Sequence, residues 1–357
     1  MDYELFLAIR PYSLGSYEKK KMFGEWLTKL TEYHRQNCIP YERLLNAMDV
    51  QPDRKMEEEE IPMLPINLFK NMELKSIAPE RIFKIVTSSG TEGQEVSRIY
   101  LDTYTARYQQ IALANIGEDF WGGQRIPFLV IDSPDVLKKR EMFSARGAGI
   151  LGFSIFSSGI CYALDREMRL DIDGVEAFLE QHKGKKILVF GFTYMIWKYL
   201  YKVLASQGKK LNLTNGILVH GGGWKKLENQ SVSSEEFKDR ISQVTGISRI
   251  HNYYGMAEQT GCIYMECSCG NFHASVYSDI ITRRPDDFSP CRYGEKGIIQ
   301  VLSPLARSYP GHSILTEDEG ILLGADDCPC GRLGKYFKVT GRIRQAQVRG
   351  CSDTYEG

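Results

Sequence analysis

The sequence predicts an α/β fold: a mainly parallel sheet flanked by helices, with a helical N-terminal part and a smaller β-rich portion. Three short apolar runs have the length and composition of buried strands: IPFLVID at 126–132, KKILVFG at 185–191 and NGILVHGGG at 215–223. Longer stretches with helical patterning separate these runs. Because strands that alternate with helices are typical of parallel sheets, we expect the middle of the chain to form one.

The segments on either side of this core have other patterns. From Ser16 to about Asn46, apolar residues recur every three or four positions, which predicts an amphipathic helix. Two prolines in IPMLPINLFK at 61–70 favour an extended segment. Later, GIIQVL at 297–302 and ILLG at 321–324 predict short strands of the β-rich portion. We therefore expect a helical N-terminal region at 1–75, a core at 76–340 and a C-terminal tail at 341–357.

Composition excludes several classes of partner. The 357 residues include 45 basic (Lys, Arg) and 45 acidic (Asp, Glu) side chains, so no overall field attracts nucleic acid or an anionic membrane. Charges at Asp2, Glu4 and Arg10 exclude a secretory signal and a membrane span at the start of the sequence. Nine cysteines, an odd number, argue against a complete disulfide framework. We expect a cytoplasmic protein without a membrane span.

A loop rich in glycine and hydroxyl residues follows an apolar segment. FKIVTSSGTEG at 83–93 contains Ser88, Ser89, Gly90, Thr91 and Gly93. Glycines let the backbone approach an anion closely, and hydroxyl and backbone N–H groups donate to phosphate oxygens. No Gly-Lys-Ser/Thr follows, so the loop is not a Walker A sequence. It predicts a phosphate-binding loop, with an ordinary Ser/Gly turn as the alternative.

Two further motifs follow in order, HGGGW at 220–224 and NYYGMAEQTG at 252–261. Together with TSSGTEG at 87–93, they resemble the adenylate-forming superfamily of acyl-CoA ligases, and within it the phenylacetate-ligase branch. The resemblance implies an adenylate-forming-enzyme-like large domain that binds ATP and Mg2+. Ala257 departs from the family pattern, because a hydroxyl residue is usual at this position.

The resemblance also implies roles for individual residues. Glu258 would hold Mg2+, although a single glutamate is more often a surface carboxylate, and Asp318 would bind the ribose, with a solvated acidic turn as its alternative. Arg342 belongs to a Gly-Arg pair that resembles the hinge before the family's C-terminal lid. The implied nucleotide-binding residues are Ser88, Ser89, Gly90, Thr91, Gly93, Gly221, Gly222, Gly223, Tyr254, Gly255, Asp318 and Arg342.

The last residues resemble a particular branch. No C-terminal lid domain is expected, since the sequence ends at Gly357, and the residue that would replace the lid lysine is left open. VRGCSDTYEG at 348–357 is similar to the end of the acyl-protein synthetases, subunits of bioluminescence fatty-acid reductases that adenylate a fatty acid and transfer it to their own cysteine. By that likeness Cys351 is the acyl acceptor. The likeness covers most of the chain from about residue 80 onward.

The surroundings of Cys351 are compatible with this role. An acyl-adenylate is a mixed anhydride, and a thiolate competes well with water for it. Arg349 favours the thiolate, whereas Asp353 acts in the opposite sense. A free cysteine in a terminal tail is the alternative.

Cysteines and a histidine gather in the second half of the sequence. Two CxC pairs, Cys267/Cys269 and Cys328/Cys330, together with His273 offer five ligands for a tetrahedral Zn2+. Unligated buried cysteines are the alternative. A similar arrangement in some phenylacetate-ligase relatives implies Cys267, His273, Cys328 and Cys330 as the ligands and Cys269 as the alternate. Because four protein ligands leave no position for water, the zinc should be structural.

Three functional hypotheses remain. The first is an ATP-dependent acyl-protein synthetase that activates a carboxylic, fatty acid as acyl-AMP and hands the acyl group from Cys351 to a partner reductase or acyltransferase. The second is an acyl- or aryl-CoA ligase whose lid is a separate chain, which a dependence on coenzyme A would reveal. The third is a zinc-stabilised, non-catalytic nucleotide-binding scaffold, which the absence of pyrophosphate exchange with any acid would favour.

Overall fold

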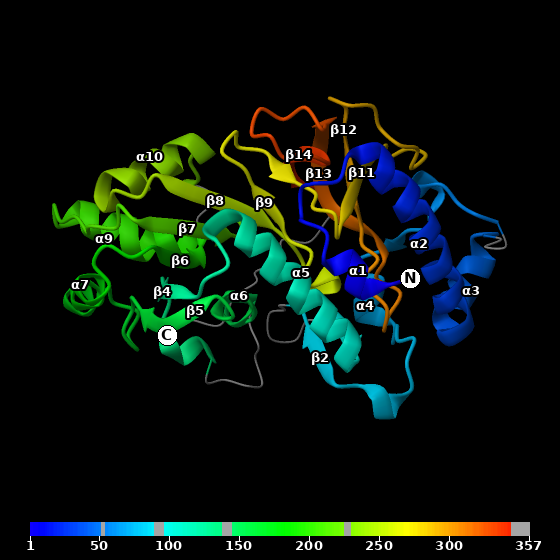
Figure 1. Ribbon diagram of the computed structural model, residues 1–357, viewed down its shortest axis with the longest axis horizontal. Helices are drawn as coiled ribbons and strands as arrows, with labels where there is room; N and C mark the ends of the chain where they lie inside the picture. Colours follow the sequence, from blue (N-terminus) through cyan, green and yellow to red (C-terminus); the bar gives the residue numbers. More distant parts are fainter. Residues whose placement is uncertain (51–53, 89–95, 138–144, 225–229, 344–357) are drawn as a thin grey trace. The chain divides into compact units, whose positions relative to one another are not determined.

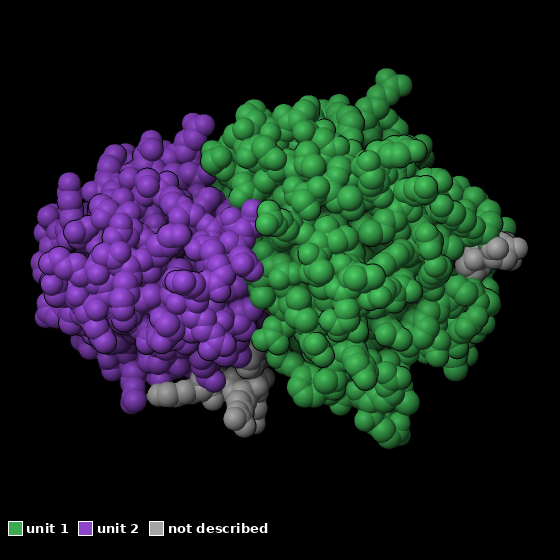
Figure 2. Space-filling view, in the orientation of Figure 1, with its two compact units in different colours: residues 1–88, 93–116, 255–348 green, residues 89–92, 117–254, 349–357 purple. Residues whose placement is uncertain are grey.

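The computed structural model describes residues 1–50, 54–88, 96–137, 145–224 and 230–343 (Figure 1). These residues form two compact units (Figure 2). The first unit contains 1–88, 96–116 and 255–343, and the second contains the described residues from 117 to 254. The segment predicted as the N-terminal helical region, 1–75, therefore shares a unit with the later part of the chain.

The second unit contains a parallel sheet with the strand order β5-β4-β6-β7-β8. Its strands are β4 (Ile126–Val130), β5 (Ser157–Tyr162), β6 (Ile187–Phe192), β7 (Gly216–Gly221) and β8 (Arg249–Tyr254). All side chains of β4, β6 and β7 are buried, as in a parallel sheet covered on both faces. The three apolar runs are thus confirmed as strands, and the α/β class is confirmed with them.

Helices cover both faces of this sheet. On one face Val189 and Leu218 share an apolar core with the helices that follow β5, β6 and β7. These helices are α7 (Ile172–Gln181), the π-helix η4 (Ile196–Tyr201), α9 (Lys202–Ser206) and α10 (Ser234–Thr245). The short helix α8 (Thr193–Met195) directly precedes η4. On the other face, Phe153 of α6 (Ala145–Ser154) stacks on Phe190, with ring centroids 4.7 Å apart. Neighbouring residues of a strand point to opposite faces, so Val189 and Phe190 each contact a different helical layer.

The strand order changes direction at β4. The next strand in the chain, β5, lies on one side of β4, whereas β6 lies on the other. In open α/β sheets, ligands bind beyond the carboxyl ends of the strands at the point where the order reverses. Residues 131–133 after β4 and 193–195 after β6 occupy this position.

The first unit contains the β-rich portion. Six strands form an antiparallel sheet in the order β11-β12-β13-β14-β10-β9, and β1 pairs in parallel with β13. Their bounds are β1 (Leu64–Pro65), β9 (Tyr264–Glu266), β10 (Phe272–His273), β11 (Asp279–Arg283), β12 (Lys296–Leu302), β13 (Ser313–Ala325) and β14 (Lys335–Arg342). A separate hairpin consists of β2 (Lys84–Thr87) and β3 (Arg98–Leu101).

Two strands of this sheet were predicted from apolar runs. The run at 297–302 is confirmed as β12, whereas 321–324 is only part of β13, which is 13 residues long. The apolar pattern underestimates β13 because Glu317, Asp318 and Glu319 interrupt it. Asp318 and Glu319 nevertheless pair with Arg342 and Gly341 of β14, and Glu319 also pairs with Ile298 of β12.

The N-terminal helices pack on the antiparallel sheet. Phe23, Leu27 and Leu30 of α2 (Ser16–Asn37) form a buried cluster with Ile281 of β11 and Leu302 of β12. The other helices of this unit are α1 (Tyr3–Leu7), α3 (Ile39–Ala47), η1 (Glu58–Glu60), α4 (Leu68–Asn71), η2 (Pro79–Arg81) and η6 (Ala257–Gln259). The helix α5 (Thr103–Trp121) contributes residues to each unit, and η3 (Pro134–Leu137) lies in the second unit. No helix in the described part of the chain is long and apolar enough to cross a bilayer.

The helix predicted from Ser16 to about Asn46 is interrupted. α2 ends at Asn37, Cys38 is extended, and α3 begins at Ile39. Pro40 explains the break, because proline has no N–H for a hydrogen bond to the preceding turn but is tolerated in the first turn of a new helix. The segment 61–70 is extended only in part, since β1 is followed by one turn of helix, α4.

Candidate functional site

The loop predicted to bind phosphate begins at the end of β2. Ser88 and Ser97 join its two ends: the Ser88 hydroxyl accepts from the Ser97 N–H at 2.9 Å, and the Ser88 N–H donates to the Ser97 carbonyl at 3.1 Å. The strand expected before the loop is confirmed as β2. Ser89, Gly90, Thr91 and Gly93 lie outside the described residues.

The three glycines of HGGGW lie at the carboxyl end of β7. A Cβ atom on Gly221 would lie 2.4 Å from the ring of Tyr253, and one on Gly222 would lie 2.6 Å from the ring of Phe192. Gly222 also has a φ of 70°, whereas an added Cβ on Gly223 would meet no atom within 4 Å. Aromatic rings and backbone geometry therefore require glycine at positions 221 and 222, but not at 223.

Thr193 holds this turn from the start of α8. Its hydroxyl lies 2.9 Å from the Gly222 carbonyl, 3.2 Å from the Gly221 carbonyl and 2.9 Å from Nδ1 of His220. A hydroxyl has only one hydrogen, and Thr193 donates it to a glycine carbonyl. The Thr193 oxygen must therefore accept from His220, which places the proton of the ring on Nδ1. Burial, followed by the charges of Lys238 and His251, lowers the pKa of His220 to about 3. The neutral His220 ring and the Thr193 hydroxyl thus fix the backbone of the glycine turn.

We expect Gly222→Ala to destabilise the second unit by about 1–2 kcal/mol, because alanine at a positive φ is strained and its Cβ would overlap Phe192. Urea unfolding measures this change. Gly223→Ala is the matched control and should leave the unfolding midpoint unchanged. Equal losses in the two variants would contradict the assignment of the constraint to Gly222.

The motif at 252–261 continues from β8. Tyr254 is the last residue of β8, Gly255 is exposed, and Glu258 lies in η6 with only 5% of its surface exposed. Tyr309 donates to the Glu258 carbonyl at 2.8 Å, and Gln259 Nε2 donates to the Gly311 carbonyl at 2.9 Å. Glu258 is therefore a buried carboxylate on a fixed backbone rather than a surface side chain.

Asp318 and Arg342 are brought together by the sheet. They are register partners on β13 and β14, and Arg342 Nε lies 3.3 Å from Asp318 Oδ1. Asp318 lies within a strand rather than in the acidic turn considered as the alternative. Two residues that the sequence nominated separately therefore form one ion pair.

The candidate metal ligands lie together in the first unit. Cys267 follows β9, His273 ends β10, and Cys328 and Cys330 lie between β13 and β14. Their ligand atoms are all within 4.8 Å of one another, with Cys267 Sγ 3.9 Å from Cys328 Sγ and Cys330 Sγ 3.4 Å from His273 Nε2. Both CxC turns are closed by a hydrogen bond from a glycine N–H, Gly270 to the Cys267 carbonyl and Gly331 to the Cys328 carbonyl.

These separations fit a tetrahedral zinc site. With Zn–S bonds of about 2.3 Å and Zn–N bonds of about 2.0–2.1 Å, tetrahedral ligands are about 3.8 Å (S to S) and 3.5 Å (S to N) apart. Burial, followed by Arg332 and Lys19, lowers the pKa of His273 to about 4, so its ring is neutral at pH 7. Cys269 is exposed and is not part of the cluster. The donor set and its spacing therefore fit the four ligands that the resemblance implied.

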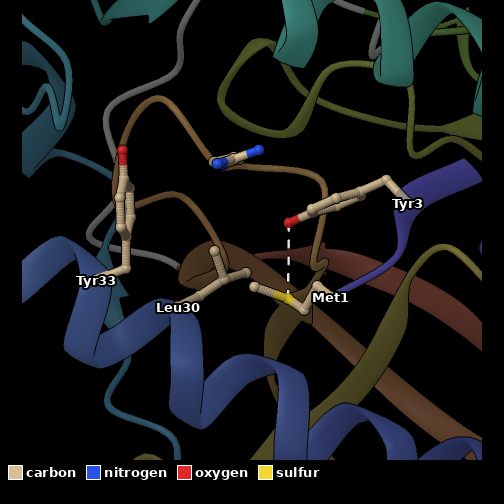
Figure 3. Close-up of a pocket in the computed structure, with 5 residues that line it drawn as sticks. Met1, Tyr3, Leu30 and Tyr33 are labelled. Atoms are coloured by element: carbon tan, nitrogen blue, oxygen red, sulfur yellow. Dashed lines mark hydrogen bonds between the residues drawn. The ribbon is translucent and has the colours of Figure 1, made fainter.

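A small pocket lies elsewhere in the first unit (Figure 3). Its volume is about 150 Å³, and it is lined by Met1, Tyr3, Leu30, Tyr33 and Arg307. Pockets for organic ligands usually have volumes of roughly 300–1,000 Å³. None of the predicted site residues lines it, so we assign it no role. Cys351, the candidate acyl acceptor, lies outside the described residues.

Asp132 and Arg146 were not nominated from the sequence. They form a largely buried ion pair, with Arg146 Nε 3.3 Å from Asp132 Oδ2. The available signal was the position of Asp132 directly after the apolar run at 126–131, at the carboxyl end of a strand.

Two solved structures with a similar fold are those of an acyl-CoA ligase. An open conformation of a 2-hydroxyisobutyryl-CoA ligase in complex with 2-HIB-AMP and CoA superposes with a TM-score of 0.69 at 16% identity, covering 94% of this chain and 77% of that chain. The same ligase in its post-adenylation state gives a TM-score of 0.70 at 16% identity, covering 94% and 70%. The adenylate-forming fold implied by the motifs is thereby confirmed.

Sequence relatives give the family. The chain is 22% identical to a long-chain-fatty-acid–luciferin-component ligase of Vibrio harveyi, over 98% of this chain and 91% of the relative. It is also 22% identical to the ligase of the same name from Aliivibrio fischeri, over 98% and 92%. The family described as acyl-protein synthetase, LuxE, matches residues 2–356. Because this match covers nearly the whole chain, the protein belongs to the acyl-protein synthetase family LuxE, a family of acid ligases with the adenylate-forming fold.

Proposed function

We propose that the chain uses ATP and Mg2+ to activate a fatty acid as its acyl-AMP and then transfers the acyl group to its own Cys351. The observation that supports this most is the family match over residues 2–356, because it includes the three ordered nucleotide motifs and Cys351. The printed names of the two relatives, which are long-chain-fatty-acid ligases, support a fatty acid as the substrate.

The chemistry has two steps. A carboxylate oxygen attacks the α-phosphorus of ATP, an oxygen–phosphorus bond forms, and pyrophosphate leaves. The Cys351 thiolate then attacks the acyl carbon, a thioester forms, and AMP leaves with the bonding electron pair. The acyl group would pass from Cys351 to a partner reductase or acyltransferase.

The residues of the three motifs would bind the nucleotide. The loop that Ser88 opens would bind phosphates, and the rigid turn at Gly221–Gly223 would accept the adenine. Glu258 would hold Mg2+, which would offset the charge on the leaving pyrophosphate. The fixed backbone at Glu258 suits this role, because preorganised charge needs no rearrangement during the reaction. Asp318 would bind the ribose hydroxyls, and Arg342 orients its carboxylate.

A structural zinc is part of the same proposal. Cys267, His273, Cys328 and Cys330 would ligate Zn2+, which would cross-link the β9–β10 segment to the loop between β13 and β14. The spacing of the donor atoms supports this assignment. The metal would stabilise the fold and take no part in the reaction.

A second candidate is transfer of the acyl group to coenzyme A, with a lid supplied by another chain. The similarity in fold to a CoA ligase favours it. In that case free CoA would accept the acyl group and Cys351 would be dispensable.

Intact mass after incubation with ATP, Mg2+ and a panel of carboxylic acids tests the proposal. We expect an acyl-sized, hydroxylamine-sensitive increment in the native chain and none in Cys351→Ala. Cys269→Ala, which removes an exposed cysteine, is the matched control and should be labelled like the native chain. Equal labelling of Cys351→Ala would discard that residue, and acyl-CoA formation that persists in the same variant would favour the second candidate.

A further inference from the structure

A buried arginine stands where the strand order of the parallel sheet reverses. Arg146 lies in the first turn of α6, Asp132 follows β4, and Tyr194 follows β6. Arg146 Nε lies 3.3 Å from Asp132 Oδ2, and its Nη1 donates to the Tyr194 hydroxyl at 3.2 Å. The guanidinium group thus spans the carboxyl ends of β4 and β6, the preferred ligand position of this sheet.

The donors of Arg146 are incompletely used. Only 12% of its side chain is exposed, and Nε faces the Asp132 carboxylate, whereas Nη2 makes no hydrogen bond with any described residue. Nη1 donates to Tyr194 and contacts the Met195 sulfur at 3.4 Å, which is a weak acceptor. A guanidinium group has five N–H donors, and buried donors are normally paired with acceptors. Among the described residues, the site therefore lacks an acceptor for Nη2, which a ligand could supply.

Asp132 holds Arg146 in place. The Asp132 side chain is 4% exposed, and its Oδ1 accepts from the Ser133 N–H at 2.8 Å. Burial raises the pKa of Asp132, and the charge of Arg146 opposes that rise. The carboxylate fixes one edge of the guanidinium while Tyr194 fixes another. Because a planar guanidinium binds carboxylates and phosphates through two parallel hydrogen bonds, its orientation decides which ligand atoms it can reach.

Among the described residues at this edge, two further polar side chains carry no positive charge. Thr193 is engaged with the glycine turn, and His220 is neutral at pH 7. The helix packs closely on the sheet here: an added Cβ on Gly149, one turn further along α6, would lie 2.8 Å from the fully buried ring of Phe190 and 3.5 Å from the Tyr253 hydroxyl.

We propose that Arg146 binds the anionic oxygens of a substrate at the carboxyl ends of β4 and β6, and that Asp132 and Tyr194 position its guanidinium group. This inference rests on the proposed function. Two substrates could supply the oxygens, the carboxylate of the acid or a phosphate of ATP. We expect the carboxylate, because the loop predicted at 83–93 would bind the phosphates.

Calorimetric titration of the full chain separates these sources. We expect Arg146→Gln to raise the Kd for the fatty acid at least tenfold, to leave the Kd for ATP unchanged, and to leave the Kd for the fatty alcohol of equal length unchanged. A rise in the Kd for ATP alone would identify a phosphate as the ligand. Asp132→Asn should also raise the Kd for the acid and leave the Kd for the alcohol unchanged. If Asp132 had only a structural role, its replacement would not affect the acid alone.

Arg240→Gln is the matched control, because Arg240 is an exposed arginine of α10 paired only with Glu236 among the described residues. If Arg146→Gln does not fold, Arg146→Lys keeps the charge and removes the two-pronged geometry, and the same shift is expected. Unchanged Kd values for acid and ATP in a folded Arg146 variant would overturn the inference. Failure of the native chain to bind any acid or ATP would instead contradict the proposed function.

Discussion

Replacing Cys328 by serine is expected to remove the zinc ion and to lower the free energy of unfolding by more than about 4 kcal/mol, since loss of a structural metal is among the largest single-residue effects. The Cys328 thiol is buried and lies 3.9 Å from Cys267 Sγ. Elemental analysis should find about one zinc per native chain and none in Cys328→Ser. Thermal unfolding should show the accompanying loss of stability.

Cys269→Ser distinguishes a metal site from a general need for cysteine. Cys269 belongs to the same CxC pair as Cys267 but is exposed and lies outside the cluster. This variant should keep its zinc and its unfolding midpoint. Zinc loss in Cys269→Ser, or a native chain that purifies without metal and gains no stability from added zinc, would contradict the assignment of the four ligands.

The cluster of three cysteines and His273 illustrates what a single sequence can predict. Cysteine and histidine are uncommon residues, so two CxC pairs and His273 were conspicuous even though about sixty residues separate the pairs. The strands of the parallel sheet were equally visible, because strands buried on both faces are continuous apolar runs. Such signals depend on residue type and local order, which the sequence contains directly.

Contacts between polar side chains of different helices and strands could not be predicted from residue type and local order. Arg146 and Asp132 are ordinary charged residues in the sequence, and only the fold shows that both are buried at the same sheet edge. The break at Cys38 could have been recognised from Pro40, because proline is rarely found inside a helix. No comparable local signal links residues whose partners lie hundreds of positions away.

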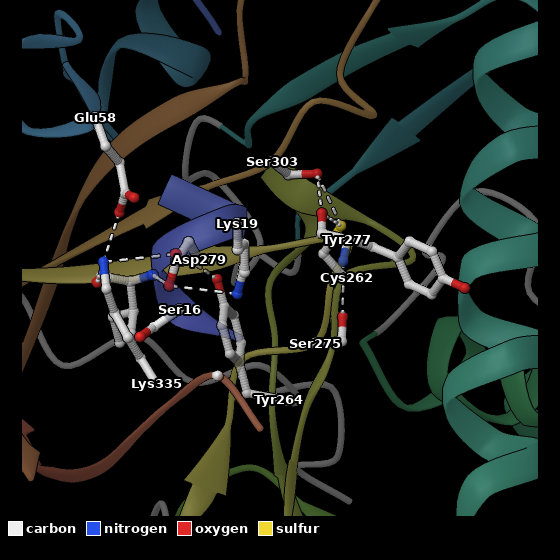
Figure 4. Close-up of polar contacts among 12 residues, drawn as sticks. Ser16, Lys19, Glu58, Cys262, Tyr264, Ser275, Tyr277, Asp279, Ser303 and Lys335 are labelled. Carbon is white, nitrogen blue, oxygen red and sulfur yellow. Dashed lines mark hydrogen bonds and ion pairs between the residues drawn. The ribbon is translucent and has the colours of Figure 1, made fainter. Parts of the chain in front are cut away.

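The charged cluster that joins the N-terminal helices to the antiparallel sheet is the clearest example. Lys335 Nζ lies 2.6 Å from Glu58 Oε1, donates to the Ile280 carbonyl at 3.1 Å and lies 3.5 Å from Asp279 Oδ2 (Figure 4). Lys19 Nζ lies 3.5 Å from Asp279 Oδ1, and Lys19, Glu58 and Asp279 are each no more than 1% exposed. In the sequence these four residues look like solvated surface charges.

Lys335→Met is expected to destabilise the chain by about 3–5 kcal/mol, because it leaves buried carboxylates without their cation. Burial alone would lower the pKa of Lys335, but Asp279 and Glu58 outweigh it and raise the pKa overall. Burial and the charge of Asp279 raise the pKa of Glu58 to about 7, against the opposing effect of Lys335 and Lys19. The shift of the Lys335 pKa thus reflects the neighbouring carboxylates, and that of the Glu58 pKa reflects mainly its burial. Urea unfolding at pH 7 measures the loss.

A double variant separates the ion pair from simple packing. Adding Glu58→Gln to Lys335→Met removes the carboxylate that the first change leaves unpaired, so the double variant should be more stable than the sum of the two single losses predicts. Lys183→Met is the matched control, because Lys183 pairs with Glu180 on the surface with 78% of its side chain exposed, and it should unfold like the native chain. Strictly additive losses would mean that Lys335 acts through the packing of its methylene groups, and the buried ion pair would then contribute nothing to joining the helices and the sheet.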